Sequence, residues 1–391
     1  MTENKNHISV FEHESIRFDK GDKRITEDQF KALEKHFGNG LPFYSLRYNG
    51  IQFNEHVGVI QVGKIVIEVL PKADKNETDT KKWKEILIGM LKAVGGFDIK
   101  ATSSSSLKIK PNSILDLYFE MFIVEVEYLL HLGLIKKYRK KEGNVTALKG
   151  NLQFAKHIQQ NLTHQERFYV RHTTYDIEHQ LHFILYKTIC LLKQINTHAA
   201  LHSRIGALLL HFLEMPEIKV SEATFAKLVF NRKNQGYKKA IEIAKLLLSQ
   251  YHPDVSKGRN HVLALMFDMN KLWEQFVYVS LRRHLKEGTS ITAETSKFFW
   301  KPENGYRSRI RPDIVINKDQ TNCIVLDTKW KNLGNYNPTS DDLRQMYVYH
   351  EYYGASKVAL VYPGIAKDLI KGNFLHPKTS VSLDKECSLI P

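Results

Sequence analysis

Two short apolar runs on either side of a polar turn, within residues 307–330, limit the fold of this chain more than any other feature. The first run, Ile-Val-Ile, follows Asp313, and the second, Cys-Ile-Val-Leu, leads into Asp327, Thr328 and Lys329. The six residues between the runs read Asn-Lys-Asp-Gln-Thr-Asn, a composition typical of a turn. This arrangement predicts a β-hairpin.

Side-chain alternation along the two predicted strands brings acidic and basic groups to one face. Successive side chains in a strand point to opposite faces, so Asp327 and Lys329 project to the same side. On the first strand, Arg309, Arg311 and Asp313 share a face. Asp313 precedes Asp327 by fourteen positions (327 − 313). The hairpin therefore places the two carboxylates opposite each other.

Two carboxylates and an amine at one point favour a metal-dependent hydrolase. Like charges repel, and a hard divalent cation with oxygen ligands relieves that repulsion. The predicted ligands of Mg²⁺ are Asp313, Asp327 and the backbone carbonyl of Thr328, and Mn²⁺ is expected to substitute for Mg²⁺. Lys329 would orient or deprotonate the attacking water, or stabilise charge on the phosphorane, as a phosphodiester is hydrolysed. The alternative is an ordinary hairpin with an Asp–Lys pair on its surface.

Two predicted helices flank this hairpin and add candidate site residues. The upstream helix begins at Met269, and Glu274 lies near its apolar face, where it is either a further metal ligand, directly or through water, or a solvated side chain. The downstream helix begins at Asp341 and places Gln345 and Tyr349 on one face, because they are four positions apart. We expect Gln345 to support catalysis and Tyr349 to contact the DNA backbone; the alternative is simple packing.

The chain divides into three predicted regions, which together indicate an α+β, multidomain protein. Residues 1–105 are β-rich, with period-two alternation of apolar residues in several runs. Residues 106–260 are mainly helical. Residues 261–391 hold the hairpin and its flanking helices, and we expect an α/β core around a mixed central sheet. The serine run at 103–106 is expected to be a loop or linker.

The charge balance indicates a polyanionic partner. Lys and Arg number 57 against 42 Asp and Glu, which gives a formal net charge of +15. Such an excess suits DNA or RNA, although a basic protein without such a partner is the alternative. A basic cluster at 136–141, beside a predicted turn at Gly143 and Asn144, either contacts phosphates or is a solvated turn.

Cysteine usage and hydropathy exclude several classes of protein. Cys190, Cys323 and Cys387 are far apart and form no CxxC pair, which argues against a zinc ribbon and against a disulfide framework. The first residues are polar, and no run of about 18 apolar residues is present. We therefore expect a cytoplasmic protein with no membrane partner.

The candidate site residues resemble those of PD-(D/E)xK nucleases, and of the McrC family in particular. The matching motifs are Arg311-Pro-Asp313, Asp327-Thr-Lys329, and Gln345 with Tyr349 after a Leu-Trp-Glu helix. Residues 58–72 and 148–152 are also similar to that family, so the resemblance spans most of the chain. McrC proteins are the nuclease subunits of modification-dependent restriction systems of the McrBC type.

This resemblance implies a partner and a division of labour. The partner would be an McrB-like AAA+ GTPase that forms a hexameric ring, hydrolyses GTP and recognises modified cytosine in double-stranded DNA. The amino-terminal part of this chain would insert into the ring and stimulate GTP hydrolysis. The chain has no GxxxxGK[ST] motif of its own. The basic residues Arg307, Arg309 and Arg311 would attract the DNA backbone toward the metal.

Three functions remain open at this point. The first is the magnesium-dependent endonuclease subunit of a GTP-driven, methylcytosine-dependent restriction complex. The second is a free-standing or differently partnered defence nuclease. The third is a non-catalytic adaptor that activates an AAA+ motor, against which the intact Asp313, Asp327 and Lys329 argue.

Overall fold

The computed structural model describes residues 7–21, 23–37, 43–73, 79–95, 113–212, 215–216, 218–252, 261–331, 338–364 and 369–391. The predicted serine linker at 103–106 lies outside these residues. The chain forms two compact units. One unit comprises Met1–Ser106 together with Met266–Pro391, and the other comprises Leu107–Leu265.

The amino-terminal part of the first unit is built from strands and two helices. A five-stranded sheet has the order β1-β6-β5-β11-β10, in which β11 is Val262–Asp268 and β10 is Tyr251–His252, and a three-stranded sheet has the order β2-β4-β3. Asp79 caps α2 by accepting hydrogen bonds from the backbone amides of Lys81 and Lys82. The elements are β1 (His7–Phe11), β2 (Ser15–Arg17), α1 (Glu27–Phe37), β3 (Tyr44–Arg47), β4 (Gly50–Phe53), β5 (His56–Val62), β6 (Ile65–Leu70) and α2 (Thr80–Val94).

The strand β11 (Val262–Asp268) differs from the predicted organisation. It is the fourth strand of the five-stranded sheet, whereas the sequence-based boundary at 261 assigns it to the nuclease region. An apolar run reveals a buried strand but not the sheet to which that strand belongs. The next residue, Met269, donates its backbone N–H to Glu55 O at 3.0 Å.

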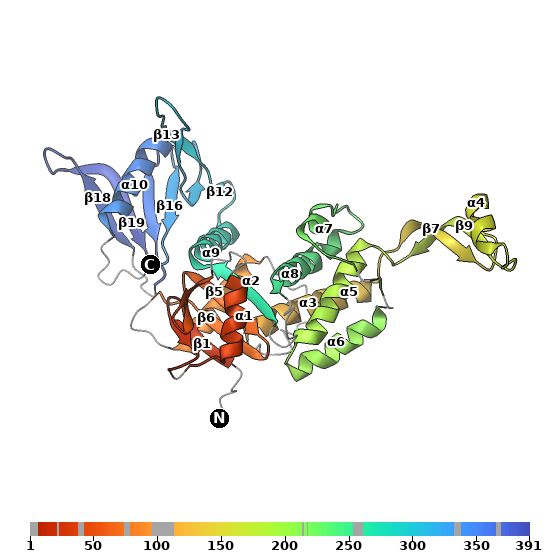
Figure 1. The fold of residues 1–391 in the computed structure, drawn as a ribbon. Helices are drawn as coiled ribbons and strands as arrows, with labels where there is room; N and C mark the ends of the chain where they lie inside the picture. Colours follow the sequence, from red (N-terminus) through yellow and green to blue (C-terminus); the bar gives the residue numbers. More distant parts are fainter. Residues whose placement is uncertain are drawn as a thin grey trace. The chain divides into compact units, whose positions relative to one another are not determined.

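The carboxy-terminal part of this unit contains a six-stranded mixed sheet with the order β12-β15-β16-β17-β19-β18. Strand β16 pairs antiparallel with β15 and parallel with β17. A separate hairpin joins β13 and β14. The elements are α9 (Met269–His284), β12 (Ile291–Ala293), β13 (Lys297–Trp300), β14 (Ser308–Ile310), β15 (Ile314–Ile316), β16 (Ile324–Thr328), α10 (Ser340–Tyr353), β17 (Lys357–Val361), β18 (Ile370–Leu375) and β19 (Ser382–Ile390) (Figure 1).

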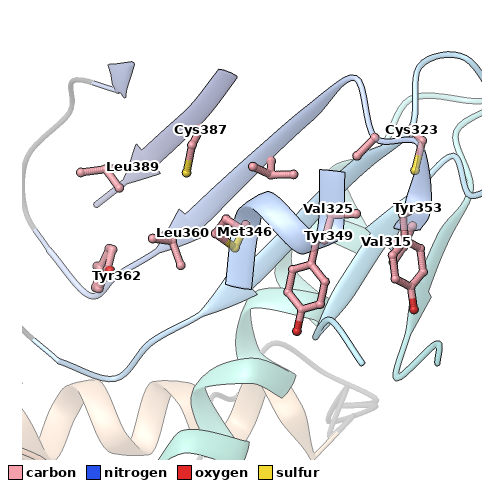
Figure 2. Close-up of a cluster of buried hydrophobic side chains, with 12 residues drawn as sticks. Val315, Cys323, Val325, Met346, Tyr349, Tyr353, Leu360, Tyr362, Cys387 and Leu389 are labelled. Carbon is pink, nitrogen blue, oxygen red and sulfur yellow. The ribbon is translucent and has the colours of Figure 1, made fainter. Parts of the chain in front are cut away.

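Successive side chains of β15 and β16 point to opposite faces of this sheet, and both faces bury a hydrophobic cluster. Ile314 and Leu326 pack with Val277 of α9 on one face. Val315 and Val325 pack with the buried side of α10 on the other, where Figure 2 labels Met346, Tyr349 and Tyr353 in the same cluster of buried side chains. Each face therefore buries apolar side chains against one helix, and together they hold the hairpin between α9 and α10.

The sequence specifies both ends of α10. Thr339 accepts a hydrogen bond from the Asp342 backbone amide, and the Asp342 carboxylate accepts one from the Thr339 amide, which forms a capping box. The helix ends at Gly354, whose φ of 58° lies in the left-handed region that favours glycine. These caps fix where α10 begins and ends, and Gln345 and Tyr349 lie between its two ends.

The second unit is mostly helical but contains a three-stranded sheet of order β7-β9-β8. Lys137–Val145 is one strand, so the turn predicted at Gly143 and Asn144 is wrong. These two residues pair with Val170 and Tyr169 of β9, and long-range pairing overrides their local turn preference. The elements are α3 (Ile114–Leu132), β7 (Lys137–Val145), β8 (Asn151–Leu152), α4 (Phe154–Asn161), β9 (Phe168–Asp176), α5 (Gln180–Ile195), α6 (Ala199–His211), α7 (Glu222–Ala226), η1 (Gln235–Tyr237), α8 (Lys238–Ser249) and β10 (Tyr251–His252).

Within the described ranges, no helix is both long enough and apolar enough to span a membrane.

Candidate active site

Asp313 and Asp327 stand at matching positions of the β15–β16 hairpin. The paired residues Ile314 and Leu326 fix the register, and its continuation by one residue places 313 opposite 327. Asp313 Oδ2 accepts hydrogen bonds from Thr328 N at 2.6 Å and from Thr328 Oγ1 at 2.8 Å. The residue between Asp327 and Lys329 therefore holds the Asp313 carboxylate in place.

Asp327 is buried and strongly perturbed. Its exposed fraction is 2%, and Oδ2 forms an ion pair with Lys329 Nζ at 2.7 Å. Burial, followed by the negative charge of Asp313, raises the pKa of Asp327 to about 6. Burial alone would lower the pKa of Lys329, but the attraction of Asp327 outweighs it and the pKa of Lys329 is raised. Lys329 is therefore cationic at neutral pH.

Gln345 of α10 connects Lys329 to Asp327. Its Oε1 accepts a hydrogen bond from Lys329 Nζ at 3.2 Å, and its Nε2 donates to Asp327 Oδ1 at 3.4 Å. The same Nε2 donates to Tyr349 OH at 2.7 Å, and Tyr349 OH donates to Arg311 O at 3.1 Å. This chain of hydrogen bonds sets the orientation of the Gln345 amide and, through it, the position of the ammonium group.

Tyr349 does not lie where a DNA-contacting residue is expected. Only 2% of its surface is exposed, and its ring is part of the core between α10 and the sheet (Figure 2). Its hydroxyl is engaged by Gln345 and by the backbone of Arg311. The prediction that Tyr349 contacts the DNA backbone is therefore wrong, because a buried ring cannot reach a phosphate. Tyr349 instead braces Gln345.

Glu274 is half-buried and comes from the other side of the sheet. It lies on α9, beside Trp273 and Val277, which pack on the face opposite to α10. Burial, followed by the charges of Asp313 and Glu294, raises the pKa of Glu274 to about 7. The charges of the candidate site therefore affect the pKa of Glu274, although Glu274 lies on a different element from Asp313 and Asp327.

The oxygen donors present are of the kind that magnesium binds, although they do not form a closed shell. Asp327 Oδ2 is buried, and the Lys329 ammonium group lies 2.7 Å from it. A divalent cation between Asp327 and Asp313 would relieve the repulsion that raises the pKa of Asp327. Across the described ranges, no group of three or more His, Cys, Asp or Glu side chains is arranged to hold a metal ion. Further ligands would be water, phosphate or the Thr328 carbonyl.

The predicted basic strand is interrupted before it reaches Asp313. Strand β14 ends at Ile310 and β15 begins at Ile314, and the two strands belong to different sheets. Arg307 and Arg309 lie over the Phe298 ring, at 5.5 and 4.4 Å from its centroid. Because Pro312 cannot donate to a ladder hydrogen bond, the strand pattern does not continue through it.

Arg311 stands in this interruption, next to the candidate site. It is exposed, and its Nη1 lies 3.8 Å from Glu294 Oε2. Its backbone carbonyl accepts the Tyr349 hydroxyl. All three predicted arginines are exposed.

The structure adds residues that the sequence analysis did not single out. Asp342 Oδ1 lies 3.9 Å from Lys329 Nζ, and its Oδ2 lies 2.5 Å from Lys331 Nζ. Its place three residues after Thr339 is a visible capping signal, but that signal does not reveal the lysines. Trp330 Nε1 donates to Glu12 Oε1 at 3.0 Å, a contact across 318 positions for which the sequence contains no local signal.

Comparisons with known proteins agree on one relationship. A family model described as McrBC 5-methylcytosine restriction system component matches residues 51–363. A half-complex of Thermococcus gammatolerans McrB AAA+ hexamers with bound McrC contains a chain similar to this one, with a TM-score of 0.73 and 22% identity over 98% of this chain and 94% of that chain. A chain of the Thermococcus gammatolerans McrBC complex has a TM-score of 0.52 and 21% identity over 72% of this chain and 88% of that chain. No curated protein matches the sequence significantly.

Proposed function

Since this chain belongs to the family of McrBC 5-methylcytosine restriction system components, we propose that it is the McrC-type nuclease subunit of such a system. In this proposal it is a magnesium-dependent endonuclease that cuts double-stranded DNA when an AAA+ GTPase partner drives the complex. The observation that carries the proposal is the buried Asp327 carboxylate, held between Lys329 and Gln345 and opposite Asp313.

Each residue of this set has a chemical role in the proposal. Asp313 and Asp327 would hold Mg²⁺, which would supply Lewis acidity toward the phosphate and acidify water. Lys329, cationic because of its acidic neighbours, stabilises negative charge on the phosphorane rather than removing a proton. Attack of water on phosphorus breaks one P–O bond and leaves an alcohol on one DNA end and a phosphate monoester on the other.

Gln345 and Glu274 have supporting roles. Gln345 holds the Lys329 ammonium group beside Asp327, so that the ammonium is in place before DNA arrives. Glu274 comes from the opposite face of the sheet, and we assign it to a water-mediated position at the metal. Burial and then the negative charge of Asp313 and Glu294 raise its pKa, and a bound divalent cation would neutralise that charge.

We further propose an McrB-like AAA+ GTPase hexamer as the partner. One similar Thermococcus gammatolerans chain belongs to an assembly of McrB AAA+ hexamers with bound McrC, and the other belongs to the McrBC complex. In the second unit, three exposed apolar side chains follow one another at four-residue spacing: Phe154 and Ile158 of α4, and Leu162 directly after it. Their exposed fractions are 70%, 60% and 74%. Such a patch is typical of a protein interface. It lies outside the amino-terminal part of the chain, which the resemblance to McrC proteins implies as the part that inserts into the ring.

Cleavage of methylated and unmethylated plasmid with Mg²⁺ tests the proposal. The chain is assayed alone and with an McrB-like AAA+ GTPase, with and without GTP. We expect cutting only of methylated DNA and only in the complete mixture, and none by the Asp327→Asn variant. Cutting by the chain alone would favour a free-standing nuclease. GTPase stimulation without any cutting would favour the non-catalytic adaptor.

A further inference from the structure

The hairpin of β13 and β14 exposes an unusual number of aromatic side chains to solvent. Phe298, Phe299 and Trp300 have exposed fractions of 49%, 44% and 57%, and Tyr306 in the connecting loop has 98%. Aromatic side chains of this size normally contribute to a core. The exposure of four such side chains within nine positions indicates a ligand-binding surface.

The same hairpin is strongly basic. Residues 297–311 read Lys-Phe-Phe-Trp-Lys-Pro-Glu-Asn-Gly-Tyr-Arg-Ser-Arg-Ile-Arg, with five cations and one acid. Arg307 and Arg309 both lie over the ring of Phe298, which holds the two guanidinium groups on one face of the hairpin. The Phe298 ring is thus a platform for cations, whereas Trp300 and Tyr306 are exposed toward the loop end.

The base of the hairpin is fastened to the candidate active site. Tyr352 of α10 donates its hydroxyl to Phe299 O at 3.2 Å, and the two rings meet edge to face at 6.1 Å. Tyr353 donates its hydroxyl to Thr295 O at 3.0 Å. Glu294 donates its backbone N–H to Asp313 O at 3.2 Å. These hydrogen bonds hold the base of the hairpin against α10 and beside Asp313.

Charge and aromatic character together identify the occupant. Phosphates need cations, and every base presents a flat π-face to an aromatic ring. A two-stranded β-ribbon also fits a groove of B-form DNA. Lys297 lies 3.6 Å from Asp319, and Arg311 lies 3.8 Å from Glu294, so Lys301, Arg307 and Arg309 are the cations that a partner has to neutralise. An apolar protein surface would match the aromatic rings but would leave these three cations without complementary charge. DNA satisfies both properties at once.

We propose that the β13–β14 hairpin is a DNA-binding wedge in which Trp300 and Tyr306 stack on partly unstacked bases of duplex DNA, next to the phosphodiester held at Asp313 and Asp327. The inference rests on the proposed nuclease function and adds a base-contacting element to it. Arg307 and Arg309 hold the flanking phosphates. Inserted aromatic or apolar side chains of this kind unstack base steps and kink the duplex.

Binding of the full-length chain to two DNAs in EDTA tests this inference. One DNA is a fully paired duplex, and the other is the same duplex with a short unpaired bubble. We expect tighter binding of the bubble, because the cost of unstacking is already met. Trp300→Ala and Tyr306→Ala should each weaken binding about tenfold and reduce the preference for the bubble. The matched control is Tyr48→Ala, another aromatic side chain, which is 82% exposed.

Tryptophan fluorescence gives a second readout that a merely structural role would not change. The chain has four tryptophans, and Trp300 is the most exposed of them. Stacking on a base should quench its emission when DNA is added. Trp300→Phe should keep near wild-type affinity, since Phe also stacks, but should lose that quenching.

Three results would overturn the inference. If Trp300→Ala and Tyr306→Ala bind both DNAs as the wild type does while the wild type binds and cuts DNA, the wedge is wrong and the nuclease function stands. If these variants lose self-association instead of DNA binding, the surface binds a second copy of the chain. If the wild-type chain neither binds DNA alone nor cuts it in the complete mixture, the wedge and the proposed function fail together.

Discussion

Trp330 Nε1 donates a hydrogen bond to Glu12 Oε1 at 3.0 Å, so the residue directly after Lys329 is tied to the residue directly after β1. Glu12 is 8% exposed and also accepts the Lys72 backbone amide at 2.7 Å. The Trp330 ring lies between Trp83 of α2 and Trp273 of α9, with centroid distances of 6.3 and 5.5 Å. The amino-terminal part thus contacts the strand that carries the candidate catalytic residues.

Replacing Trp330 by Phe should weaken this connection. The variant keeps a ring among its neighbours but leaves the buried Glu12 without one donor, which costs about 1–3 kcal/mol of unfolding free energy. We expect the melting temperature to fall by several degrees in thermal unfolding. Trp300→Phe, the same substitution at an exposed site, is the control and should melt as the wild type does. If the two variants have the same melting temperature, the Trp330–Glu12 hydrogen bond does not stabilise the fold.

Asp327→Asn and Lys329→Ala should each abolish DNA cleavage in the complete mixture. The first removes a charged metal ligand and the second removes the cation beside the phosphorane, so we expect the rate to fall at least about a thousandfold. DNA binding and GTPase stimulation should be retained. Asp384→Asn, at an exposed position of β19, is the control. Cleavage at the wild-type rate by either site variant contradicts the assignment.

Tyr349→Phe tests whether the hydroxyl positions Gln345. The ring stays in the core, but Nε2 of Gln345 loses its 2.7 Å partner and is less restrained. We expect kcat for cleavage to fall about tenfold with KM unchanged, and stability to fall by about 1 kcal/mol. Tyr347→Phe, on the partly exposed side of the same helix, should change neither quantity. An unchanged kcat for Tyr349→Phe would reduce Gln345 and Tyr349 to packing residues.

Without metal, the contribution of Glu274 and Asp327 to stability should fall as pH rises through the acidic and neutral range. The pKa of Glu274 is raised from 4.5 to about 7, and that of Asp327 from 3.8 to about 6. Between these limits the two carboxyl groups bind more protons in the folded state than in the unfolded state, so their contribution to the unfolding free energy declines with increasing pH. Thermal unfolding from pH 4 to pH 8 in EDTA measures this decline.

The same experiment with Mg²⁺ separates the site from other titrating groups. A divalent cation binds the ionised carboxylates, so Mg²⁺ should raise the melting temperature more at pH 8 than at pH 5. Glu274→Gln removes one of the perturbed carboxyl groups and should flatten the decline in EDTA. A variant whose profile matches the wild type would show that Glu274 is not coupled to the site.

Charge reversal of Arg307, Arg309 and Arg311 should weaken DNA binding through lost phosphate contacts. The logarithm of the binding constant falls with the logarithm of salt concentration by about 0.9 for each phosphate neutralised. We expect the triple variant to lose roughly 2–3 from the magnitude of that slope, measured by fluorescence anisotropy. Lys20→Glu, an exposed reversal in the amino-terminal part, is the control. Unchanged affinity at low salt would contradict the assignment.

Several elements near the site follow from local pattern. The β15–β16 hairpin is predicted by two apolar runs around a polar turn, and the structure has that hairpin. The helix predicted to begin at Asp341 is present as α10, because capping residues mark its start. The predicted McrC-family membership is confirmed by the family match over residues 51–363. These features depend on side chains that are neighbours in the chain, which is why sequence reasoning reaches them.

Other features depend on contacts between distant segments. The assignment of β11 to the amino-terminal sheet and the continuous β7 strand both follow from long-range pairing. The burial of Tyr349 follows from packing between α10 and the sheet. Local propensity is a weak guide where strand pairing and core packing decide the outcome.

The sequence by itself determined the hairpin, the order of Asp313, Asp327 and Lys329 along it, and the helix that carries Gln345. Tertiary structure alone decided that Gln345 joins Lys329 to Asp327, that Arg309 lies on a separate hairpin with Phe298, and that Trp330 contacts Glu12. The physical reason is the range of the forces involved. Alternation and capping act within a few residues, whereas burial, charge and hydrogen bonding at the site join segments that meet only when the chain is folded.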